Sequence, residues 1–394
     1  MKKIIILFYL FLLNIIGFAN DGIFFTSGNQ LIPITETEIS VQKEILSITR
    51  QGGHLYVHVY YEFFNPGAEK TLLVGFEAMP PGGAWAIEEE EYKKLTDHPN
   101  IFDFTVKLNG QSLKYQVSHV ENQENYFQNG KFDELSKQRE LELGREWEFS
   151  EGIPYYFVYH FDATFKKGLN IVEHTYLFDA SDYVGAEYCF EYVLTAANRW
   201  ANHQIDDFTL NLDLGSRCTY DVNESFFKGQ GGWTIDGVGR ENEIEKYDIK
   251  MLRFHIQDGM VTYHKKNFHP EGELFVERPF VWDEEGYISS YEEEGDCLRA
   301  IAFEFKKGYT SAMKMFYMEN EDTVVCSGIS DDMKKIMRNL PFAYRGYVFK
   351  NKMLQDYFES TDWYVANPDY VSDMKDLSEE ERRWVDFWTK QQKK

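Results

Sequence analysis

The stretch that decides the fold runs from residue 54 to residue 64 and reads His54-Leu55-Tyr56-Val57-His58-Val59-Tyr60-Tyr61-Glu62-Phe63-Phe64. Every second side chain from Leu55 onward is large and apolar, and most of those between are polar or amphipathic. This period of two is typical of a strand that buries one face and exposes the other. The next residues, Asn65-Pro66-Gly67, form a turn sequence that ends the strand.

Other segments in the first half of the chain repeat this alternation. Residues 102–108 and 113–117 flank Asn109-Gly110, a pair that tolerates positive φ, and predict a β-hairpin. Residues 155–165 and 169–178 predict a second hairpin. Further strands are expected at residues 187–196 and 208–214. Short strands at regular intervals favour an antiparallel β-sandwich, which we expect over residues 20–225.

A second β-rich region is predicted over residues 226–328. Residues 253–257 and 260–264 alternate on either side of Asp258-Gly259, the strongest short hairpin signal in the chain. Residues 273–276 and 299–305 read as additional strands. The region is either a separate small domain or an extension of the first sandwich, and the sequence leaves both open.

Two charged segments interrupt the strands of the first region, at residues 87–95 and 133–147. Both are expected to form short helices on the rim of the sandwich. Loops on a rim often carry binding sites, but they also accept insertions at little cost. We favour the tolerated insertion for both segments.

From residue 329 to residue 394 the apolar spacing changes to that of helices. Apolar side chains recur three and four residues apart at Met333, Ile336, Met337 and Leu340. Ser330 or Asp331 is the expected cap of this helix, and Pro341, which lacks an N–H, is expected to end or kink it. Two further helix starts are expected, at Asn351 and at the capping box of Ser378 and Glu381.

The helical segment also carries residues in a distinctive order. The turn Phe342-Ala343-Tyr344-Arg345-Gly346, which we call the signature turn, is followed by Trp363-Tyr364 and then by Asn367-Pro368. In order and spacing, roughly residues 329–390 resemble the YARHG domain. The resemblance implies a small, mostly helical module of exported bacterial proteins, with no known chemistry.

The first β region resembles a second family, an uncharacterised group of exported bacterial proteins. The matching residues are Asn20-Asp21-Gly22, the strand end at residues 64–67, and residues 192–195 followed by Trp200 and Ile205. The resemblance spans about 200 residues. It implies export and a β-rich fold, and no known activity.

The N-terminus reads as a secretory signal peptide over residues 1–19. Lys2 and Lys3 precede an apolar run over residues 4–13, and Gly17-Phe18-Ala19 offers small residues for cleavage after Ala19. A membrane anchor is less favoured because Asn14 interrupts the run, whereas a spanning helix needs about 20 apolar residues. We expect an exported protein of the periplasm or cell surface, with no membrane span in the mature chain.

The composition is strongly acidic. The chain has 41 basic and 65 acidic side chains and a formal charge of −24; without residues 1–19, which hold two lysines, the balance is 39 against 65, or −26. Nucleic acid is therefore excluded as an expected partner, because no basic patch overrides this field. With 43% hydrophobic and 17% aromatic residues, the chain has ample material for packed cores.

Four cysteines, Cys189, Cys218, Cys297 and Cys326, permit two disulfides in an oxidising compartment, with three possible pairings. We prefer Cys189 with Cys218 and Cys297 with Cys326, each pair 29 residues apart. Buried thiols are the alternative. No mixed cysteine and histidine cluster indicates zinc, and we expect neither a metal site nor a cofactor.

Motifs of catalysis are missing from the sequence. It contains no GxSxG elbow, no HExxH pair and no phosphate-binding GxxxxGK[ST] loop. His255 and His264 stand on either side of the expected Asp258-Gly259 turn, but two imidazoles without a third ligand more often serve as ordinary strand residues. The absence lowers the expectation of an enzyme without excluding an unrecognised active site.

Aromatic and cationic side chains supply the candidate binding residues. Arg345 beside Tyr344 can stack or grip a carboxylate, and Trp363 with Tyr364 can form a platform for a sugar or peptide. Trp200 beside Arg199 is a second possible platform. For each group the competing interpretation is structural: Arg345 locking the signature turn to a neighbouring helix, and the large aromatics filling a core.

The sequence as a whole predicts an exported, non-catalytic protein that binds or scaffolds at the bacterial cell envelope, with an unknown envelope glycan, peptide or protein as partner. The helical module is the expected contact surface, unless it only stabilises its own β-domain. The alternative function is an envelope hydrolase acting on glycan or peptide.

Overall fold

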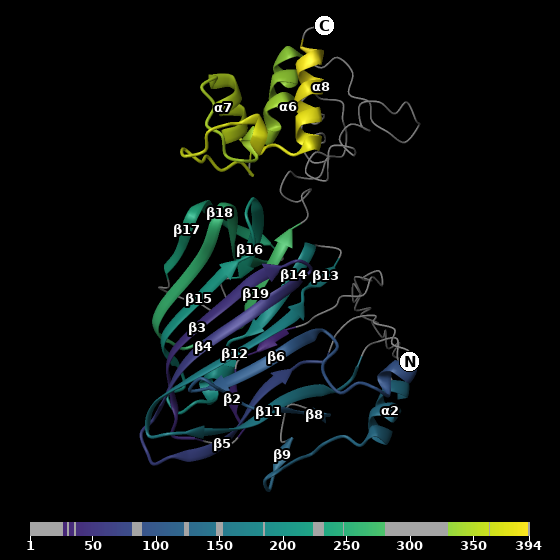
Figure 1. Ribbon diagram of the computed structural model, residues 1–394, viewed down its shortest axis with the longest axis vertical. Helices are drawn as coiled ribbons and strands as arrows, with labels where there is room; N and C mark the ends of the chain where they lie inside the picture. Colours follow the sequence, from purple (N-terminus) through teal and green to yellow (C-terminus); the bar gives the residue numbers. More distant parts are fainter. Residues whose placement is uncertain are drawn as a thin grey trace, which may run out of the picture.

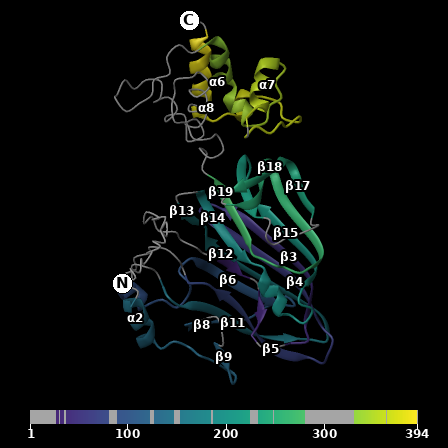
Figure 2. The ribbon, with the colours of Figure 1, turned by 180° about the vertical axis from the view of Figure 1, so that it is seen from behind.

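A computed structural model gives the arrangement of the chain (Figure 1). It describes residues 27–29, 31–34, 37–80, 89–121, 126–146, 153–183, 186–223, 232–246, 248–279, 330–361 and 363–392. The expected signal peptide, Cys297, Cys326 and the strand expected at residues 299–305 lie outside these ranges. The described residues form a large β region and a helical module at the C-terminus (Figures 1 and 2).

The mainly β fold is confirmed, and its largest sheet has 13 strands. Its path runs β1, β14, β19, β16, β18, β15, β3, β4, β12, β6, β7, with β13 beside β14 and β17 beside β18. The sheet is mixed, because β1 with β14 and β15 with β3 are parallel pairs. The strands are β1 Ser27–Asn29, β3 Ser40–Gln51, β4 His54–Asn65, β6 Ile101–Leu108, β7 Gln111–Ser112, β12 Gly168–Asp179, β13 Ser181–Tyr183, β14 Ala186–Val193, β15 Ile205–Asp213, β16 Cys218–Asn223, β17 Gly232–Lys246, β18 Ile249–Phe268 and β19 Leu274–Pro279.

A second, antiparallel sheet of four strands packs against the first. Its order is β2 Ile32–Pro33, β5 Lys70–Ala78, β11 Tyr156–Phe165 and β8 Gln116–Val120. Phe76 of β5 lies 4.9 Å from Tyr176 of β12, and Phe165 of β11 lies 5.6 Å from Phe63 of β4, ring centre to ring centre. These contacts across the two sheets give the sandwich-like layering, with the aromatic core between the layers.

The alternation in β4 has the expected consequence for burial. Leu55, Val57, Val59, Tyr61 and Phe63 are each at most 1% exposed and all belong to the main core. The large sheet also curls: Phe178 of β12 and Phe190 of β14, from strands far apart in the sheet order, have ring centres 6.0 Å apart. The core therefore fills the concave side of the curled sheet.

The first hairpin predicted in this region forms but is short, whereas the second is wrong in its pairing, although its strands are present. Asn109 and Gly110 have positive φ as expected, but β7 pairs with β6 for only two residues. The chain then crosses to the small sheet, where β8 pairs with β11. β11 and β12 likewise follow each other in the chain but lie in different sheets, since β11 pairs with β5 and β12 with β4.

The hairpin predicted at Asp258-Gly259 is also wrong. Both residues lie inside β18, a continuous strand of 20 residues that turns back on β17 instead. Asp258-Gly259 sits at a β-bulge, where Asp258 pairs with Val238 and Ile256 pairs with Gly239. Because β18 also pairs with β15 and β16, the strands over residues 232–279 extend the first sheet.

The two charged segments form short helices on the rim of the sandwich, as expected. They are α1 Glu89–Tyr92 and α2 Lys137–Glu146. A small hairpin, β9 Phe127–Gln128 with β10 Lys131–Phe132, precedes α2, and a 3-10 turn, η1 Thr195–Arg199, follows β14.

The helical module contains α6 Asp331–Ala343, α7 Lys352–Glu359, η2 Met374–Asp376 and α8 Glu379–Gln391. Ser330 and Asn351 cap α6 and α7, and Ser378 with Glu381 forms the expected capping box of α8. The module has its own core, separate from that of the sheets and rich in aromatic side chains.

Pro341 does not end α6, which continues to Ala343. A proline leaves the carbonyl four residues before it without a helical donor, here that of Met337. The indole Nε1 of Trp384 in α8 donates to that oxygen at 2.5 Å. The hydrogen bond lost inside α6 is thus replaced by one that joins α6 to α8.

Cys189 and Cys218 are both buried, and within the described residues no bond joins their sulfurs. Sγ of Cys218 instead donates to the Gly215 carbonyl oxygen, 2.8 Å away. The preferred pairing of these two cysteines is therefore not formed. Cys189 and Cys218 are instead buried thiols, which was the alternative expectation.

Candidate functional site

The signature turn has a structural role, because Arg345 connects it to neighbouring elements of the module. The guanidinium of Arg345 donates through Nη1 and Nη2 to the two carboxylate oxygens of Glu381, both at 2.8 Å, and also to the carbonyls of Pro341 and Asp376. Its side chain is 13% exposed. Arg345 is thus committed to joining the end of α6 to η2 and α8, rather than open to a ligand.

Trp363 and Tyr364 do not form an exposed platform. They are 8% and 4% exposed and belong to the core of the module. Trp363 lies against the ring of Tyr344, centroid to centroid 4.3 Å, and the hydroxyl of Tyr364 donates to the carbonyl of Tyr347 at 2.9 Å. Both residues fill space, as the competing structural interpretation expected.

Trp200 is likewise a core residue, 1% exposed, with its ring 4.3 Å from that of Phe63 and its Nε1 donating to the Leu31 carbonyl at 2.9 Å. Its neighbour Arg199 differs. The Arg199 side chain is 46% exposed and its Nη1 lies 2.9 Å from Oε1 of buried Glu77. Arg199 therefore remains partly open to solvent while Glu77 holds its guanidinium.

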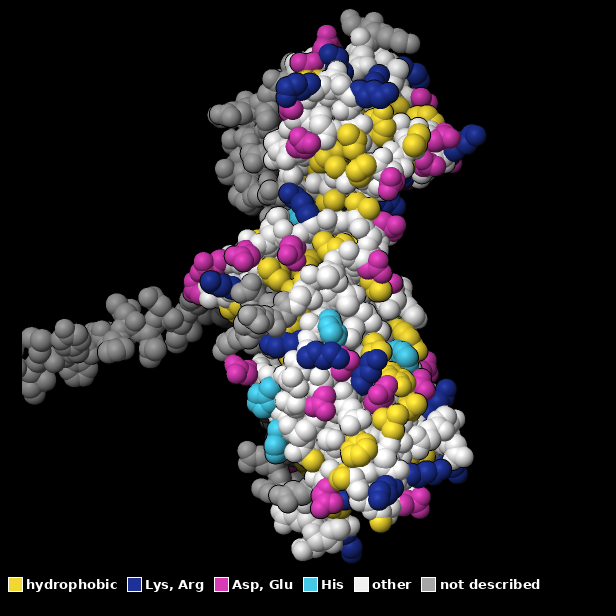
Figure 3. Space-filling model, turned by 90° about the vertical axis from the view of Figure 1, so that its left-hand side faces the viewer, with side chains coloured by type: hydrophobic (Ala, Val, Ile, Leu, Met, Phe, Trp, Pro, Cys, Tyr) yellow, Lys and Arg dark blue, Asp and Glu magenta, His cyan; other side chains and the backbone are white. Residues whose placement is uncertain are grey.

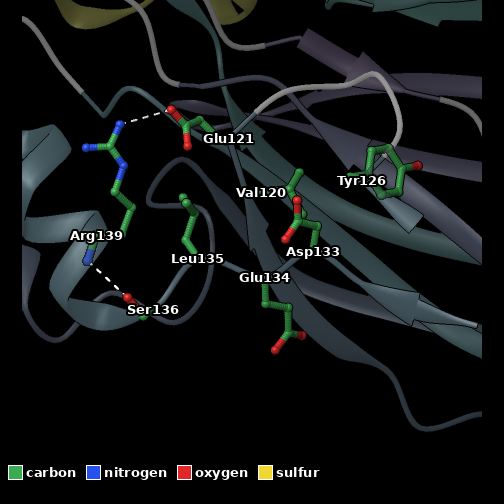
Figure 4. A pocket seen from close by; sticks show the side chains of 8 residues that line it. All are labelled: Val120, Glu121, Tyr126, Asp133, Glu134, Leu135, Ser136 and Arg139. Atoms are coloured by element: carbon green, nitrogen blue, oxygen red, sulfur yellow. Dashed lines mark hydrogen bonds and ion pairs between the residues drawn. The ribbon is translucent and has the colours of Figure 1, made fainter. Parts of the chain in front are cut away.

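A pocket of about 440 Å³ lies between the end of β8, the start of α2 and the segment joining β10 to α2 (Figure 4). Val120, Tyr126 and Leu135 form its apolar side. Its polar side consists of Glu121, Asp133, Glu134, Ser136 and Arg139. The volume falls within the range of about 300–1,000 Å³ that is usual for small-molecule sites.

A buried contact between a histidine and a carboxylate fixes α2 beside the pocket. Nδ1 of His119 in β8 lies 3.0 Å from Oε1 of Glu140 in α2, and Nε2 lies 3.0 Å from the Thr96 carbonyl. The imidazole ring therefore joins β8 to α2 on one side and to the segment before β6 on the other. Burial raises the pKa of Glu140, but hydrogen bonds from His119 and Lys137 outweigh it, and the pKa is lowered.

The charges of the pocket are unequally balanced. Arg139 donates from Nη2 to Oε1 of Glu121 at 3.0 Å and from Nη1 to Glu146 at 3.1 Å. Figure 4 shows the Arg139 and Glu121 side chains meeting at the rim. The carboxylate of Asp133 has no hydrogen-bond or ion-pair partner in the described part of the chain. Three carboxylates thus face one guanidinium, and the pocket is negative.

Arg199 connects to the pocket through two other side chains. Glu77 of β5 accepts hydrogen bonds from Arg199 and from the hydroxyl of Tyr126, which lines the pocket. Burial, and then the charge of Glu77, raise the pKa of Tyr126, so the phenol stays protonated. The back wall is therefore a fixed polar network and carries no ionised phenol.

Ser118 and His160 bring together groups that are also found in hydrolases. Oγ of Ser118 lies 2.9 Å from Nε2 of His160 and forms a short hydrogen bond with Glu134. A carboxylate only accepts, so Ser118 donates its proton to Glu134 and accepts from His160. In a serine nucleophile the hydroxyl donates to the imidazole. Ser118 is also only 2% exposed. We therefore interpret Ser118, His160 and Glu134 as a structural hydrogen-bond network beneath the pocket.

A metal centre and a membrane-spanning helix each need a feature that the described residues lack. No group of three or more His, Cys, Asp or Glu side chains there is placed to hold a metal ion. His255 and His264 lie on one strand nine residues apart, roughly 30 Å at ~3.3 Å per residue, which is too far for a shared ion. None of the helices described combines the length and hydrophobicity needed to cross a bilayer.

The pocket residues were only partly visible in the sequence. The segment 133–147 stood out as charged and at the rim, and it supplies Asp133, Glu134 and Arg139. Val120, Glu121 and Tyr126 carried no such signal. Val120 ends β8, Glu121 follows it, and Tyr126 directly precedes β9. The crossing of β8 into the second sheet brings them beside α2.

Comparisons with protein families give two matches. Residues 320–393 match the YARHG domain, and residues 19–143 match a domain of unknown function (DUF4424). The chain therefore carries a YARHG domain at its C-terminus and this domain of unknown function at its N-terminus. The second match ends within α2, so the later strands of the same sheet lie beyond it.

No curated protein is significantly similar to the chain. Among solved structures, a proposed nutrient-binding protein of Legionella pneumophila aligns over 95% of this chain and 100% of its own, at 17% identity and a TM-score of 0.42. Baculovirus P35 aligns over 61% of this chain and 97% of its own, at 10% identity and a TM-score of 0.23. Neither likeness is close enough to carry an argument.

Proposed function

We propose that this chain is an exported binding protein of the bacterial cell envelope, without catalytic activity, whose β region takes a small ligand into the pocket between β8 and α2. The pocket itself is the observation that carries this proposal. It combines an apolar side with polar groups held in place by the hydrogen bonds of α2. Export is inferred from Lys2, Lys3 and the apolar run that ends before Ala19.

The ligand is a small polar molecule with a positively charged nitrogen. Glu121 is already paired with Arg139, and Glu134 is engaged by Ser118, whereas the carboxylate of Asp133 has no partner among the described residues. A cation beside Asp133 gains a charge-assisted hydrogen bond, which is stronger than a neutral one. The formal charge of −24 attracts cations to the whole molecule.

Calorimetric titration of the chain lacking residues 1–19 tests this proposal. Amines of pocket size, such as lysine, a diamine and glucosamine, are titrated beside their N-acetylated forms, which lack the positive charge. We expect binding of at least one amine and no binding of its acetylated form. Asp133→Asn should weaken that binding about tenfold, equivalent to about 1.4 kcal/mol.

Asp369→Asn is the matched control, because Asp369 is an exposed carboxylate of the helical module, away from the pocket. It should leave the affinity unchanged. Equal affinity for charged and acetylated ligands, or equal losses in the two variants, would contradict the role of Asp133. Failure of every ligand to bind would remove the pocket as the basis of the proposal.

The alternative, an envelope hydrolase, draws on the contact between Ser118 and His160. The hydrogen bonds of that pair run in the direction opposite to nucleophile activation, so we place it second. Hydrolysis of a glycan or peptide by the same purified chain, abolished by Ser118→Ala, would reverse this order.

A further inference from the structure

The feature that carries a further inference is Gln257, the extra residue of the bulge in β18. Its neighbours Ile256 and Asp258 pair with consecutive residues of β17, so Gln257 has no partner there. On the other side, β18 pairs with β16 only as far as Ile256 and with β15 only from Val261. A bulged residue of this kind is often re-aimed away from the sheet.

Gln257 reaches the helical module. Its Nε2 donates to the carbonyl oxygen of Tyr344 at 2.8 Å, and it is 9% exposed, so the bond is shielded from water. Tyr344 is the C-cap residue of α6, and carbonyls at the C-terminus of a helix lack helical donors. The Tyr344 carbonyl in the signature turn therefore accepts a hydrogen bond from the bulge in β18. Figures 1 and 2 show the module beyond this end of the large sheet.

Arg217 adds a second link at the same place, through its backbone and its charge. The backbone N–H of Arg217, in the turn before β16, donates to the Gln257 carbonyl at 3.2 Å. Burial raises the pKa of Glu381, but hydrogen bonds from Arg345 and from the Ser378 amide, and the charges of Arg345 and Arg217, lower it overall. Glu381 is thus held from within the module by Arg345 and attracted from the β region by Arg217.

We propose that the signature turn of the YARHG domain is the docking point that latches the helical module to the β region, through the hydrogen bond from Gln257 to Tyr344 and the attraction between Arg217 and Glu381. Loss of one neutral hydrogen bond changes an equilibrium constant about fivefold. An exposed charge pair adds little and is screened by salt. The latch is consequently reversible and weakens as salt rises.

Small-angle X-ray scattering of the full mature chain, in low salt and in about 0.5 M salt, tests the latch. Gln257→Met keeps the length of the side chain and removes the donor; Arg217→Met removes the charge from an exposed turn. We expect a compact wild type in low salt, about five times more undocked chain in Gln257→Met, and a reduced effect of salt in Arg217→Met.

Gln111→Met, a glutamine in the exposed strand β7, is the matched control and should scatter as the wild type does. Identical scattering by the wild type and both latch variants at both salt concentrations would overturn the proposal. So would a wild type whose two parts already adopt widely varying separations in low salt. Should Gln257→Met fail to fold, the salt response of Arg217→Met decides, because Arg217 is exposed.

Discussion

His174 shows how a single residue links burial to acid stability. It lies on β12 inside the core, fully buried, with its ring stacked at 5.8 Å from those of Tyr61 and Tyr176. Neither ring nitrogen has a hydrogen-bond partner among the described residues. Burial, with a smaller contribution from the charge of His58, lowers the pKa of His174 to about 3. The folded protein therefore holds this ring neutral.

The pKa of His174 sets the sign of a pH effect. In the unfolded chain a histidine titrates near pH ~6.5, so below this pH the unfolded state binds one more proton than the folded state. Stability should fall as pH falls from about 6.5 towards the folded pKa, by up to ~1.4 kcal/mol per pH unit. His174→Phe should remove about 2 kcal/mol of the loss between pH 7 and pH 5.

Urea unfolding at pH 7 and pH 5 measures this difference, with each variant compared with itself so that changes in packing cancel. His203→Asn is the control, because His203 is exposed and asparagine accepts its positive φ of 51°. The control should keep the pH dependence of the wild type. If His174→Phe keeps it as well, the assignment of the effect to His174 is wrong.

At the residue scale the sequence predicts burial better than function. Period two identified the inward side chains of β4, and the caps Ser330, Asn351 and Ser378 are as expected, because alternation and capping are local patterns. The candidate binding aromatics lie in cores, since a large ring is equally suited to a platform and to packing. Only the three-dimensional neighbours of Trp200 and Trp363 distinguish these uses.

At the scale of elements, strands were predictable and their partners were not. β11 and β12 are separated by a short turn and still enter different sheets, where each pairs along its length with a strand distant in sequence. Asp258-Gly259 carries turn chemistry, but a bulge uses the same residue types as a hairpin. Pairing depends on contacts across the whole chain, which local spacing does not contain.

The bulge in β18 makes a prediction of its own. Gly259 has a φ of +100°, and a Cβ there would lie 1.9 Å from the Asp236 carbonyl oxygen. Gly259→Ala should therefore destabilise the β region by more than about 2 kcal/mol, from backbone strain and the clash together. Gly53→Ala, where a Cβ meets nothing within 4 Å, should change stability by less than about 0.5 kcal/mol. Urea unfolding of both variants, followed by circular dichroism, compares the two.

Similar midpoints for Gly259→Ala and Gly53→Ala would contradict the close approach of β17 and β18 at the bulge. A destabilised Gly259→Ala that still folds should also show more undocked chain by scattering. Gln257 is the extra residue of that bulge, so the two effects have one cause.

At the scale of the whole molecule, the separation of two cores follows from the sequence, because the change of period near residue 329 divides strands from helices. The junction between them does not follow. Gln257, Arg217, Tyr344 and Glu381 are distant in sequence and have no shared pattern. Their meeting depends on a bulge whose position the strand alternation obscured.

Removal of the module tests what the two cores contribute to each other. The main core contains no residue of the module, and the module core contains none of the sheets. A mature chain ending at residue 328 should therefore keep the urea midpoint and β-type circular dichroism of the β region, losing no more than about 1 kcal/mol from the latch. Aggregation of the truncated chain, or a large drop in its midpoint, would show instead that the module stabilises the sheets.

Fractionation of cells expressing both lengths adds the functional comparison. Unchanged folding together with lost retention at the envelope would assign the module a role in contact with a partner.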